Sequence, residues 1–259
     1  LSKNENEILF FADLASGSLD YFKDIKSTIF IIDHHEIDKD KLNDNIKIIN
    51  PYLFQEENVC TAGLCYLFAK SISGKNKDLS RLALIGMIGD KHEAPSKNYQ
   101  QILSDCPELN VKKGLLIFSA TRPIKRALEY STSLYIPGVT GSSIGTLELL
   151  REISIQPERT LEELNTEEMS NLITAVLLKR TGQKDSDNIL GNIYILKFHN
   201  KKEDIRELSV LINACSRLGY QDTAVIFCME LPAFYSQAQD MCIKYRQEIV
   251  SALKNTDTL

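Results

Sequence analysis

Short apolar runs that lead directly into a carboxylate dominate the first ninety residues. The three runs are residues 8–12 before Asp13, residues 29–32 before Asp33, and residues 82–88, which pass through Gly89 into Asp90. Continuous apolar runs of four or five residues are typical of strands buried on both faces. We therefore predict strands at 7–13 and 28–34, each with an acid at its carboxyl end.

The segments between and after these strands favour an alternation of strands with helices. The further elements expected in this part are a short helix at 19–25, a strand at 46–50, and helices at 61–72 and 80–88. Strands that alternate with helices are typical of a parallel sheet. The first part of the chain is therefore predicted to be an α/β domain built on a parallel sheet.

The pattern of hydrophobic and polar positions changes at about residue 95, and the segments that follow are predicted to be mostly helical. The later elements expected are helices at 143–153, within 161–178, at 205–218 and at 234–253, and strands at 193–197 and 223–229. The polar, glycine-bearing stretch 181–191 suits a linker. The α/β fold expected for the whole chain is thus a parallel-sheet domain with a helical insertion, followed by the start of a second, smaller α/β domain.

Composition narrows the class of protein only a little. The chain has 259 residues, 43% of them hydrophobic and 25% charged, and a net charge of −5 with a pI near 5.5. These values are ordinary for a globular protein and do not indicate a nucleic-acid binder, although a local basic groove is compatible with them. No apolar run is long enough to span a bilayer, so we expect no membrane partner and a cytoplasmic location.

The six cysteines are scattered and form no C-x-x-C pair; they are Cys60, Cys65, Cys106, Cys215, Cys228 and Cys242. Most lie in apolar surroundings. We expect small buried hydrophobic side chains here and neither disulfides nor zinc ligands.

His34 and His35 add imidazoles to the carboxylate of Asp33 at the end of the second run. Ligand sites in open α/β sheets form at the carboxyl ends of the strands, so Asp13 and Asp33 are expected in one crevice, with Asp90 delivered to the same place. This set of acids and imidazoles suits a divalent cation, with Mn²⁺ or Mg²⁺ ahead of Zn²⁺. Two such ions about 4 Å apart can promote phosphoryl displacement.

Each of these residues has a simpler explanation when it is taken alone. An aspartate that follows a strand is usually a helix N-cap or turn former, which applies to Asp13, and Asp90 suits a surface turn. A pair of histidines near a turn is more often solvated than bound to metal. The combination favours a shared metal site because each carboxylate directly ends a buried element.

Several motifs have counterparts in one known family, and they cover nearly the whole chain. The motifs are Phe11-Ala-Asp13-Leu14, Ile32-Asp33-His34-His35, Asn50-Pro51-Tyr-Leu-Phe54, the segment 61–67 with Thr61-Ala-Gly63, Ile88-Gly89-Asp90, Tyr135-Ile-Pro137-Gly138-Val-Thr140-Gly141, and the segment 206–219 with Asn213-Ala-Cys215. Together they resemble the DHH phosphoesterase superfamily, and within it the archaeal RecJ-like single-strand-specific exonucleases of the GINS-associated type.

The resemblance assigns roles to particular residues. The metal ligands that it implies are Asp13, His34 and Asp90, with Asp33 as a further ligand or as an orienting group. The catalytic residues that it implies are Asp33, His34 and His35. The substrate-binding residues that it implies are His35, Arg206 and Arg217. The two arginines have the alternative of being ordinary surface or salt-bridged side chains. His92 is a weaker candidate for the rim of the substrate site, and Cys215 is expected to pack.

The resemblance also implies a domain plan, and the chain departs from the family in two places. The plan is a DHH phosphoesterase domain at 1–120, a helical insertion or connector at 121–185, and the start of a DHH-associated substrate-binding domain at 191–259. The family's Asp-x-Asp motif on its first strand is absent, and so is its glycine-rich substrate-binding segment. We therefore expect a chain truncated at both ends, in which the two Mn²⁺ (or Mg²⁺) ions of the complete enzyme bind poorly and activity is weak or absent.

Three functions remain open at this stage. The first is a metal-dependent phosphodiesterase, a RecJ-like exonuclease that hydrolyses single-stranded DNA or RNA in replication or repair. The second is a non-catalytic scaffold that binds GINS-like replication proteins. The third is a DHH phosphodiesterase of short oligonucleotides or cyclic dinucleotides, which the predicted helices of residues 143–178 disfavour because enzymes for small substrates lack such an insertion.

Overall fold

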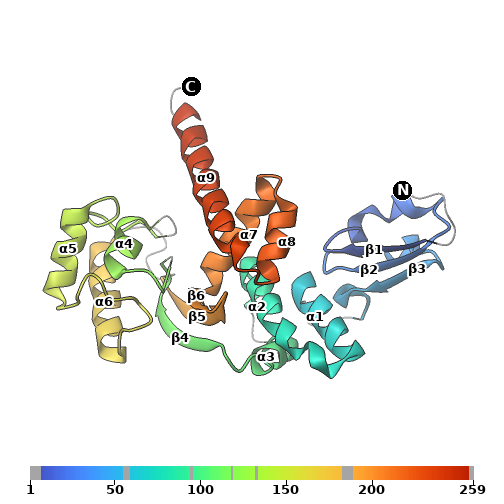
Figure 1. Ribbon diagram of the computed structural model, residues 1–259, viewed down its shortest axis with the longest axis horizontal. Coiled ribbons are helices and arrows are strands. Elements are labelled where there is room, and N and C mark those ends of the chain that lie inside the picture. The colour runs from blue at the N-terminus through green and yellow to red at the C-terminus, as the bar shows by residue number, and fades with distance from the viewer. Residues whose placement is uncertain are drawn as a thin grey trace. The chain divides into compact units, whose positions relative to one another are not determined.

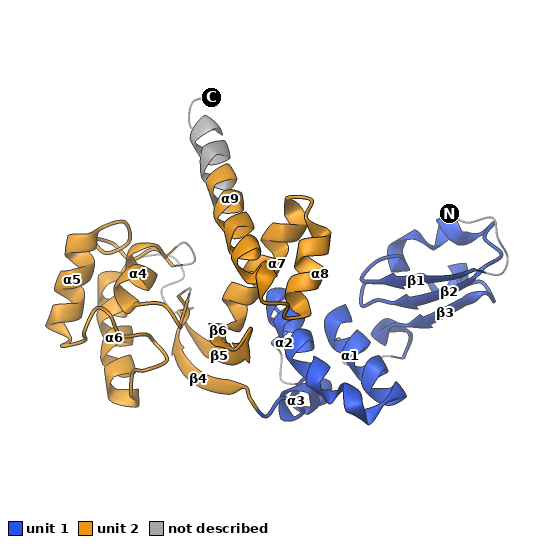
Figure 2. Ribbon diagram, in the orientation of Figure 1, with its two compact units in different colours: residues 1–107 blue, residues 108–259 orange. Residues whose placement is uncertain are grey.

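A computed structural model describes residues 7–54, 59–93, 96–117, 119–131, 134–182 and 189–256. The chain divides into two compact units, residues 1–107 and residues 108–259 (Figures 1 and 2). The three predicted domains have other boundaries, and that division stays a prediction. The mixed α/β class predicted for the chain is confirmed.

The first unit contains a three-stranded parallel sheet in the order β1-β2-β3. Its strands are β1 (Ile8–Ala12), β2 (Thr28–Ile32) and β3 (Ile46–Ile49). All three were predicted from their apolar runs. The register pairs Ala12 with Ile32 and Ile32 with Ile49, so the three strands end at the same edge of the sheet.

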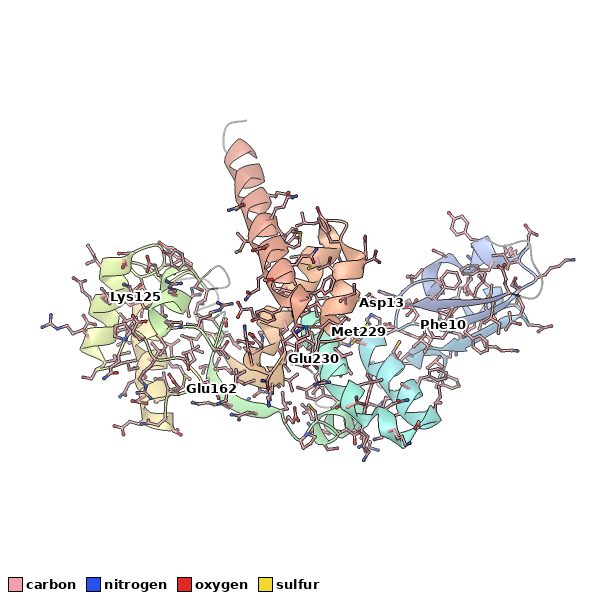
Figure 3. The ribbon with its side chains drawn as sticks, viewed as in Figure 1. Phe10, Asp13, Lys125, Glu162, Met229 and Glu230 are labelled. Carbon is pink, nitrogen blue, oxygen red and sulfur yellow. The ribbon has the colours of Figure 1, made fainter. Side chains whose placement is uncertain are left out.

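The two faces of this sheet differ in burial. One face packs on η1 (Ser16–Phe22), where Ile29 and Ile31 meet Leu19 and Phe22 in a common core. The other face leaves Ile8, Phe10 and Phe30 exposed (Phe10 is labelled in Figure 3). The prediction of strands buried on both faces is therefore wrong for this face within the described residues.

Helices complete the first unit. They are the short 3-10 helices η2 (Lys39–Lys41), η3 (Pro51–Leu53) and η4 (Gly74–Leu79), and the α-helices α1 (Thr61–Ile72), α2 (Ser80–Gly89) and α3 (Lys97–Ser104). The helices α1 and α2 pack closely, because a Cβ added at Gly86 would lie 2.4 Å from the Cβ of Ala62. This contact fixes the end of α2 that carries Asp90.

The second unit contains an antiparallel sheet in the order β4-β5-β6. Its strands are β4 (Asn110–Leu115), β5 (Leu190–Phe198) and β6 (Lys201–Asp204). Its helices are α4 (Ile124–Glu129), α5 (Ser143–Glu152), α6 (Thr166–Lys179), α7 (Ile205–Arg217), α8 (Gln221–Cys228) and α9 (Ala233–Thr256). Helices α4, α5 and α6 contribute to one large apolar core together with β4 and β5.

One secondary-structure prediction for this unit is wrong, and two strands, β4 and β6, were not predicted. The expected strand at 223–229 is helix α8, in which Thr223, Ala224 and Phe227 are buried at helical spacing. Strand β4 was not predicted, because its residues are polar and rich in lysine; it forms by pairing with β5 from Asn110 to Leu115. The predicted linker 181–191 lies partly outside the described residues.

The cysteines are free thiols, and Cys60, Cys106, Cys215 and Cys242 are buried, as predicted. Burial raises the pKa of the Cys215 thiol, which fits the expected packing role. No helix in the described ranges combines the length and apolarity that a membrane span requires.

Candidate metal centre

Polar residues follow all three parallel strands at one edge of the sheet. The backbone N–H of Asp13 donates to Ile32 O at 3.0 Å, and that of Asp33 donates to Ile49 O at 3.1 Å, so the strand ladder continues into both aspartates. Asp13 then takes a left-handed conformation with φ 65°, which turns the chain away from the strand. The hydrogen bonds between the strands therefore bring these strand ends together, as predicted.

Asp33 is the buried support of this edge, with a side chain that is 1% exposed. Its Oδ2 accepts a hydrogen bond from Ser16 N at 3.0 Å, and its Oδ1 accepts from His34 N at 2.8 Å. Burial on its own would raise the pKa of Asp33, but these bonds and the one to His35 hold it below the ordinary value. The carboxylate is therefore ionised, and both of its oxygens accept hydrogen bonds from residues of the neighbouring loops.

The exposed imidazole of His35 is oriented by the same carboxylate. Its Nδ1 lies 2.6 Å from Asp33 Oδ1, a charge-assisted distance. This bond raises the pKa of His35 against a smaller opposing effect of burial, with further help from the charges of Asp13 and Asp90. Asp33 thus orients the ring through Nδ1, and the His35 side chain is 56% exposed.

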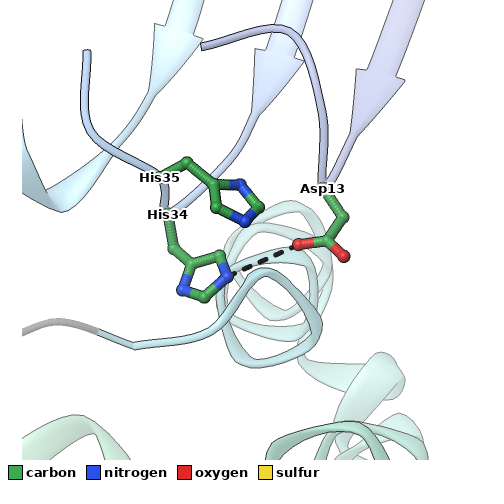
Figure 4. Close-up of side chains that lie close together, drawn as sticks. All are labelled: Asp13, His34 and His35. Atoms are coloured by element: carbon green, nitrogen blue, oxygen red, sulfur yellow. Dashed lines mark ion pairs between the residues drawn. The ribbon is translucent and has the colours of Figure 1, made fainter. Parts of the chain in front are cut away.

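His34 lies between two carboxylates that come from different elements. Its Nε2 is 3.6 Å from Asp13 Oδ1, as Figure 4 shows, and 3.5 Å from Asp90 Oδ2 at the end of α2. The His34 side chain is 11% exposed, whereas that of Asp13 is 63% exposed. Within the described part of the chain, His34 Nδ1 is buried without a hydrogen-bond partner, so Nε2 is the ring nitrogen that faces the acids.

The spacing of these three groups suits a cation. The contacts at 3.5 and 3.6 Å exceed an ordinary N–H···O hydrogen bond of about 2.7–3.2 Å. Ligands held about 2.1 Å from an octahedral cation are separated by about 3 Å when adjacent and about 4.2 Å when opposite. The groups Asp13-His34-His35 and His34-Asp90-His92 each offer three ligand atoms within 4.8 Å of one another. The donor set therefore fits a divalent metal.

The structure brings together some of the predicted site residues and separates others. Asp13 and Asp90 each approach His34, in two ligand groups that share this histidine, and the ring centroid of His35 lies 4.5 Å from that of His34. Asp33 was expected to be either a metal ligand or an orienting group. It lies outside both candidate ligand clusters, so the orienting role is better supported. The ligand and catalytic assignments themselves stay predictions.

The two predicted substrate arginines lie on α7 in the second unit. Arg206 donates through Nη1 to Asn192 O at 2.6 Å and lies over the ring of Tyr194. Arg217 is exposed near the other end of the helix. Eleven residues correspond to about three helical turns, so the two Cα positions lie on one side of α7 about 16 Å apart.

Two buried residues support the site: Ser16, which was not singled out from the sequence, and Asn50, which was quoted only within a motif and given no role. Asn50 Nδ2 donates to Ser16 Oγ at 3.0 Å and to His35 O at 2.9 Å, which links the loops after β1, β2 and β3. Asn50 directly follows β3 at the same edge as Asp13 and Asp33. The rule of polar residues at strand ends, applied to the third strand as well, would have found it.

Comparison with known proteins found two similarities. Residues 117–188 match the family model of the DHH-CID domain. The chain also resembles a solved structure of RecJ from Thermus thermophilus in complex with Mn²⁺, with a TM-score of 0.46 and 14% identity. That match covers 96% of this chain and 29% of the RecJ chain. No curated protein matches the sequence. The domain match concerns residues 117–188, less than half of the chain.

Proposed function

We propose that the first unit carries the metal centre of a DHH-type phosphodiesterase. The observation that carries this proposal is the convergence of Asp13 and Asp90 on the largely buried His34, beside an imidazole that Asp33 holds in place. The match of residues 117–188 to the DHH-CID domain supports it independently. The cation would be Mn²⁺ or Mg²⁺, held by Asp13, His34 and Asp90.

The residues around the centre have separate tasks in this proposal. A bound divalent cation would supply electrostatic activation of a phosphate ester. His35, held by Asp33 and with a raised pKa, places positive charge where a phosphate oxygen gains negative charge during ester cleavage. Ser16 and Asn50 hold the loops in register, so they are positioning residues that do not contact the substrate.

The proposed substrate is single-stranded DNA or RNA, and the proposed setting is that of a RecJ-like exonuclease of the archaeal, GINS-associated type. Arg206 and Arg217 lie on one side of α7 and are proposed to contact phosphates. The guanidinium of Arg206 already donates to the backbone and lies over an aromatic ring, so Arg217 is the more accessible of the two.

The experiment is the Mn²⁺-dependent release of nucleotides from end-labelled single strands. Asp13→Asn removes a proposed ligand from an exposed position and keeps a residue type that tolerates φ 65°. Asp24→Asn changes an exposed aspartate of the same unit and is the matched control. We expect weak release by the unchanged chain and by the control, and none above background by Asp13→Asn, because metal catalysis depends on the complete ligand set.

The same assay separates the alternatives. Faster turnover of a dinucleotide than of a long strand would favour a small-substrate phosphodiesterase. Release no greater than that of Asp33→Ala, together with tight binding of GINS-like proteins, would favour a scaffold and contradict the enzyme.

A further inference from the structure

The turn after α2 brings a second histidine to the edge of the candidate metal centre. Asp90 follows the last residue of the helix, and Lys91 takes a left-handed conformation with φ 58°. The N–H of His92 then donates to Met87 O at 2.8 Å, which draws the chain back over the helix end. The position of His92 is therefore fixed by the backbone, and it is not that of a residue on a freely extended loop.

The imidazole of His92 faces the same carboxylate oxygen as His34. His92 Nε2 lies 3.9 Å from Asp90 Oδ2, and His34 Nε2 lies 3.5 Å from that oxygen. The rings of the two histidines meet edge to face with their centroids 5.1 Å apart. Two ring nitrogens thus approach one carboxylate at separations too long for hydrogen bonds and suited to ligands around a shared ion.

The simpler explanation is an ion pair between His92 and Asp90. At 3.9 Å and beside an exposed carboxylate, such a pair would add little stability. It would also not account for the second imidazole at the same oxygen. His92 is 27% exposed, so its ring is sheltered enough to be held in place and open enough to admit an ion.

We propose that His92 is a metal ligand, so that His34, Asp90 and His92 form a ligand group of two imidazoles and one carboxylate, which shares His34 with the group that contains Asp13. This inference rests on the proposed function, since it concerns the same metal centre. It adds a ligand and predicts which metal the centre selects. A set with two nitrogen donors favours a first-row transition metal such as Mn²⁺, Co²⁺ or Zn²⁺ over Mg²⁺.

The reason for this selectivity lies in the chemistry of the donors. Mg²⁺ prefers oxygen ligands and keeps several waters, so it gains little from an added imidazole. Imidazole is a good ligand for Zn²⁺ and for its neighbours in the first row. Removal of His92 should therefore weaken transition-metal binding and leave Mg²⁺ binding nearly unchanged. A residue with a merely structural role would affect both metals alike.

The test is calorimetric titration of the chain with MnCl₂ and, separately, MgCl₂. Loss of an outer-shell partner weakens metal affinity by about 10–100-fold, so we expect at least a tenfold loss for Mn²⁺ in His92→Ala. The affinity for Mg²⁺ should change less than about threefold on the same reasoning. The visible absorption of the Co²⁺-loaded chain should shift in the same variant. His199→Gln removes an imidazole from the second unit and is the matched control.

Each outcome decides the inference. Equal weakening of Mn²⁺ and Mg²⁺ binding, or Mn²⁺ binding by His92→Ala equal to that of the unchanged chain, overturns the ligand role of His92. If Asp13→Asn still abolishes Mn²⁺ binding in that case, the proposed metal centre stands without His92. If the unchanged chain binds none of these metals, the centre itself is absent, and the inference fails with it. Circular dichroism of His92→Ala and of His92→Gln checks that both variants are folded.

Discussion

Both sheets end in aspartates, but the aspartates are used differently. In the second unit, Asp204 at the end of β6 is buried and accepts hydrogen bonds from Ala120 N and Arg206 N, both at 2.9 Å. It caps helix α7, and burial raises its pKa. In the first unit, Asp13 follows β1 and extends into solvent within ion-pair distance of His34.

The difference distinguishes structural carboxylates, whose oxygens accept hydrogen bonds from the backbone, from the carboxylates of the proposed metal centre. The oxygens of Asp204 are taken by the backbone, so they have little capacity for a ligand. Asp13 and Asp90 are exposed and converge on an imidazole without close hydrogen bonds, an arrangement that contributes little to folding. Asp33 combines both features, because it is buried and hydrogen-bonded and its partners are the residues of the site.

The sharpest test of the structural class is Asp204→Ala. The substitution removes a helix cap and leaves the buried N–H of Ala120 without its acceptor. We expect the free energy of unfolding to fall by about 2–4 kcal/mol, from the usual costs of a lost cap and an unsatisfied buried donor. Urea unfolding measures it, with the exposed Asp240→Ala as control. An equal loss in both variants would remove the distinction.

Asn50→Ala tests whether the loops after β1, β2 and β3 depend on the hydrogen bonds of the buried Asn50 side chain. The variant loses the bonds to Ser16 Oγ and His35 O, and the amide of Tyr52 loses its acceptor. We expect unfolding to become easier by about 1–3 kcal/mol, the usual cost of unsatisfied buried groups. Mn²⁺ titration should show weaker binding as well, because the loop that carries His35 is released. Full stability with full Mn²⁺ affinity would show that Asn50 does not hold the site.

Asp105→Asn tests whether a buried, hydrogen-bonded carboxylate stabilises the fold in the first unit as well. Asp105 is almost fully buried; burial opposes its ionisation, but bonds from Lys70 and Tyr66 hold its pKa below the ordinary value of 3.8. A carboxylate with a lowered pKa stabilises the fold above its unfolded-state pKa and loses that contribution as pH falls through the folded-state pKa. We expect a loss of about 1–2 kcal/mol at pH 7, typical of hydrogen bonds to a charged group.

That difference between Asp105→Asn and the unchanged chain should shrink as pH falls below 3.8 and through the lowered folded-state pKa of Asp105, because the carboxyl group then becomes neutral like the amide of asparagine. Urea unfolding at pH 7 and at pH 3 measures it. A difference that stays constant or grows in acid would show that Asp105 is not stabilised by its ionised form.

The smallest effect on stability is expected for Asp13→Asn. The side chain is exposed, and asparagine tolerates the left-handed backbone, so the free energy of unfolding should change by less than about 0.5 kcal/mol. The Mn²⁺ affinity should nevertheless fall at least about tenfold, since a ligand is removed. A large loss of stability with unchanged affinity would place Asp13 in the structural class.

Much of the candidate metal centre could be predicted from the sequence, because the apolar runs and the acids that follow them are neighbours in the chain. The apolar runs predicted all three parallel strands, and the acids that follow them predicted the convergence of Asp13 and Asp90 near His34. His92 was a weak candidate, since its place depends on the turn at Lys91, which the sequence pattern does not show.

Other parts of the fold depend on contacts that are distant in the sequence. Residues 223–229 have the composition of a strand, but they are helical because Ala224 and Phe227 pack at helical spacing in a layer with α7 and α9. Strand β4 carries Lys112 and Lys113 and has no alternating pattern, so only its pairing with β5 makes it a strand. Short runs of this kind are ambiguous until their partners are known.

The central claim is that Asp13, His34 and Asp90 hold a divalent cation. The most direct measurement is an anomalous difference map from crystals of the chain soaked in MnCl₂, recorded at the manganese absorption edge. The account predicts a peak about 2.0–2.3 Å from His34 Nε2 and from at least one of Asp13 Oδ1 and Asp90 Oδ2, the range of Mn²⁺ bonds to oxygen and nitrogen. A map with no peak among these three atoms, or with manganese bound only elsewhere, would contradict it.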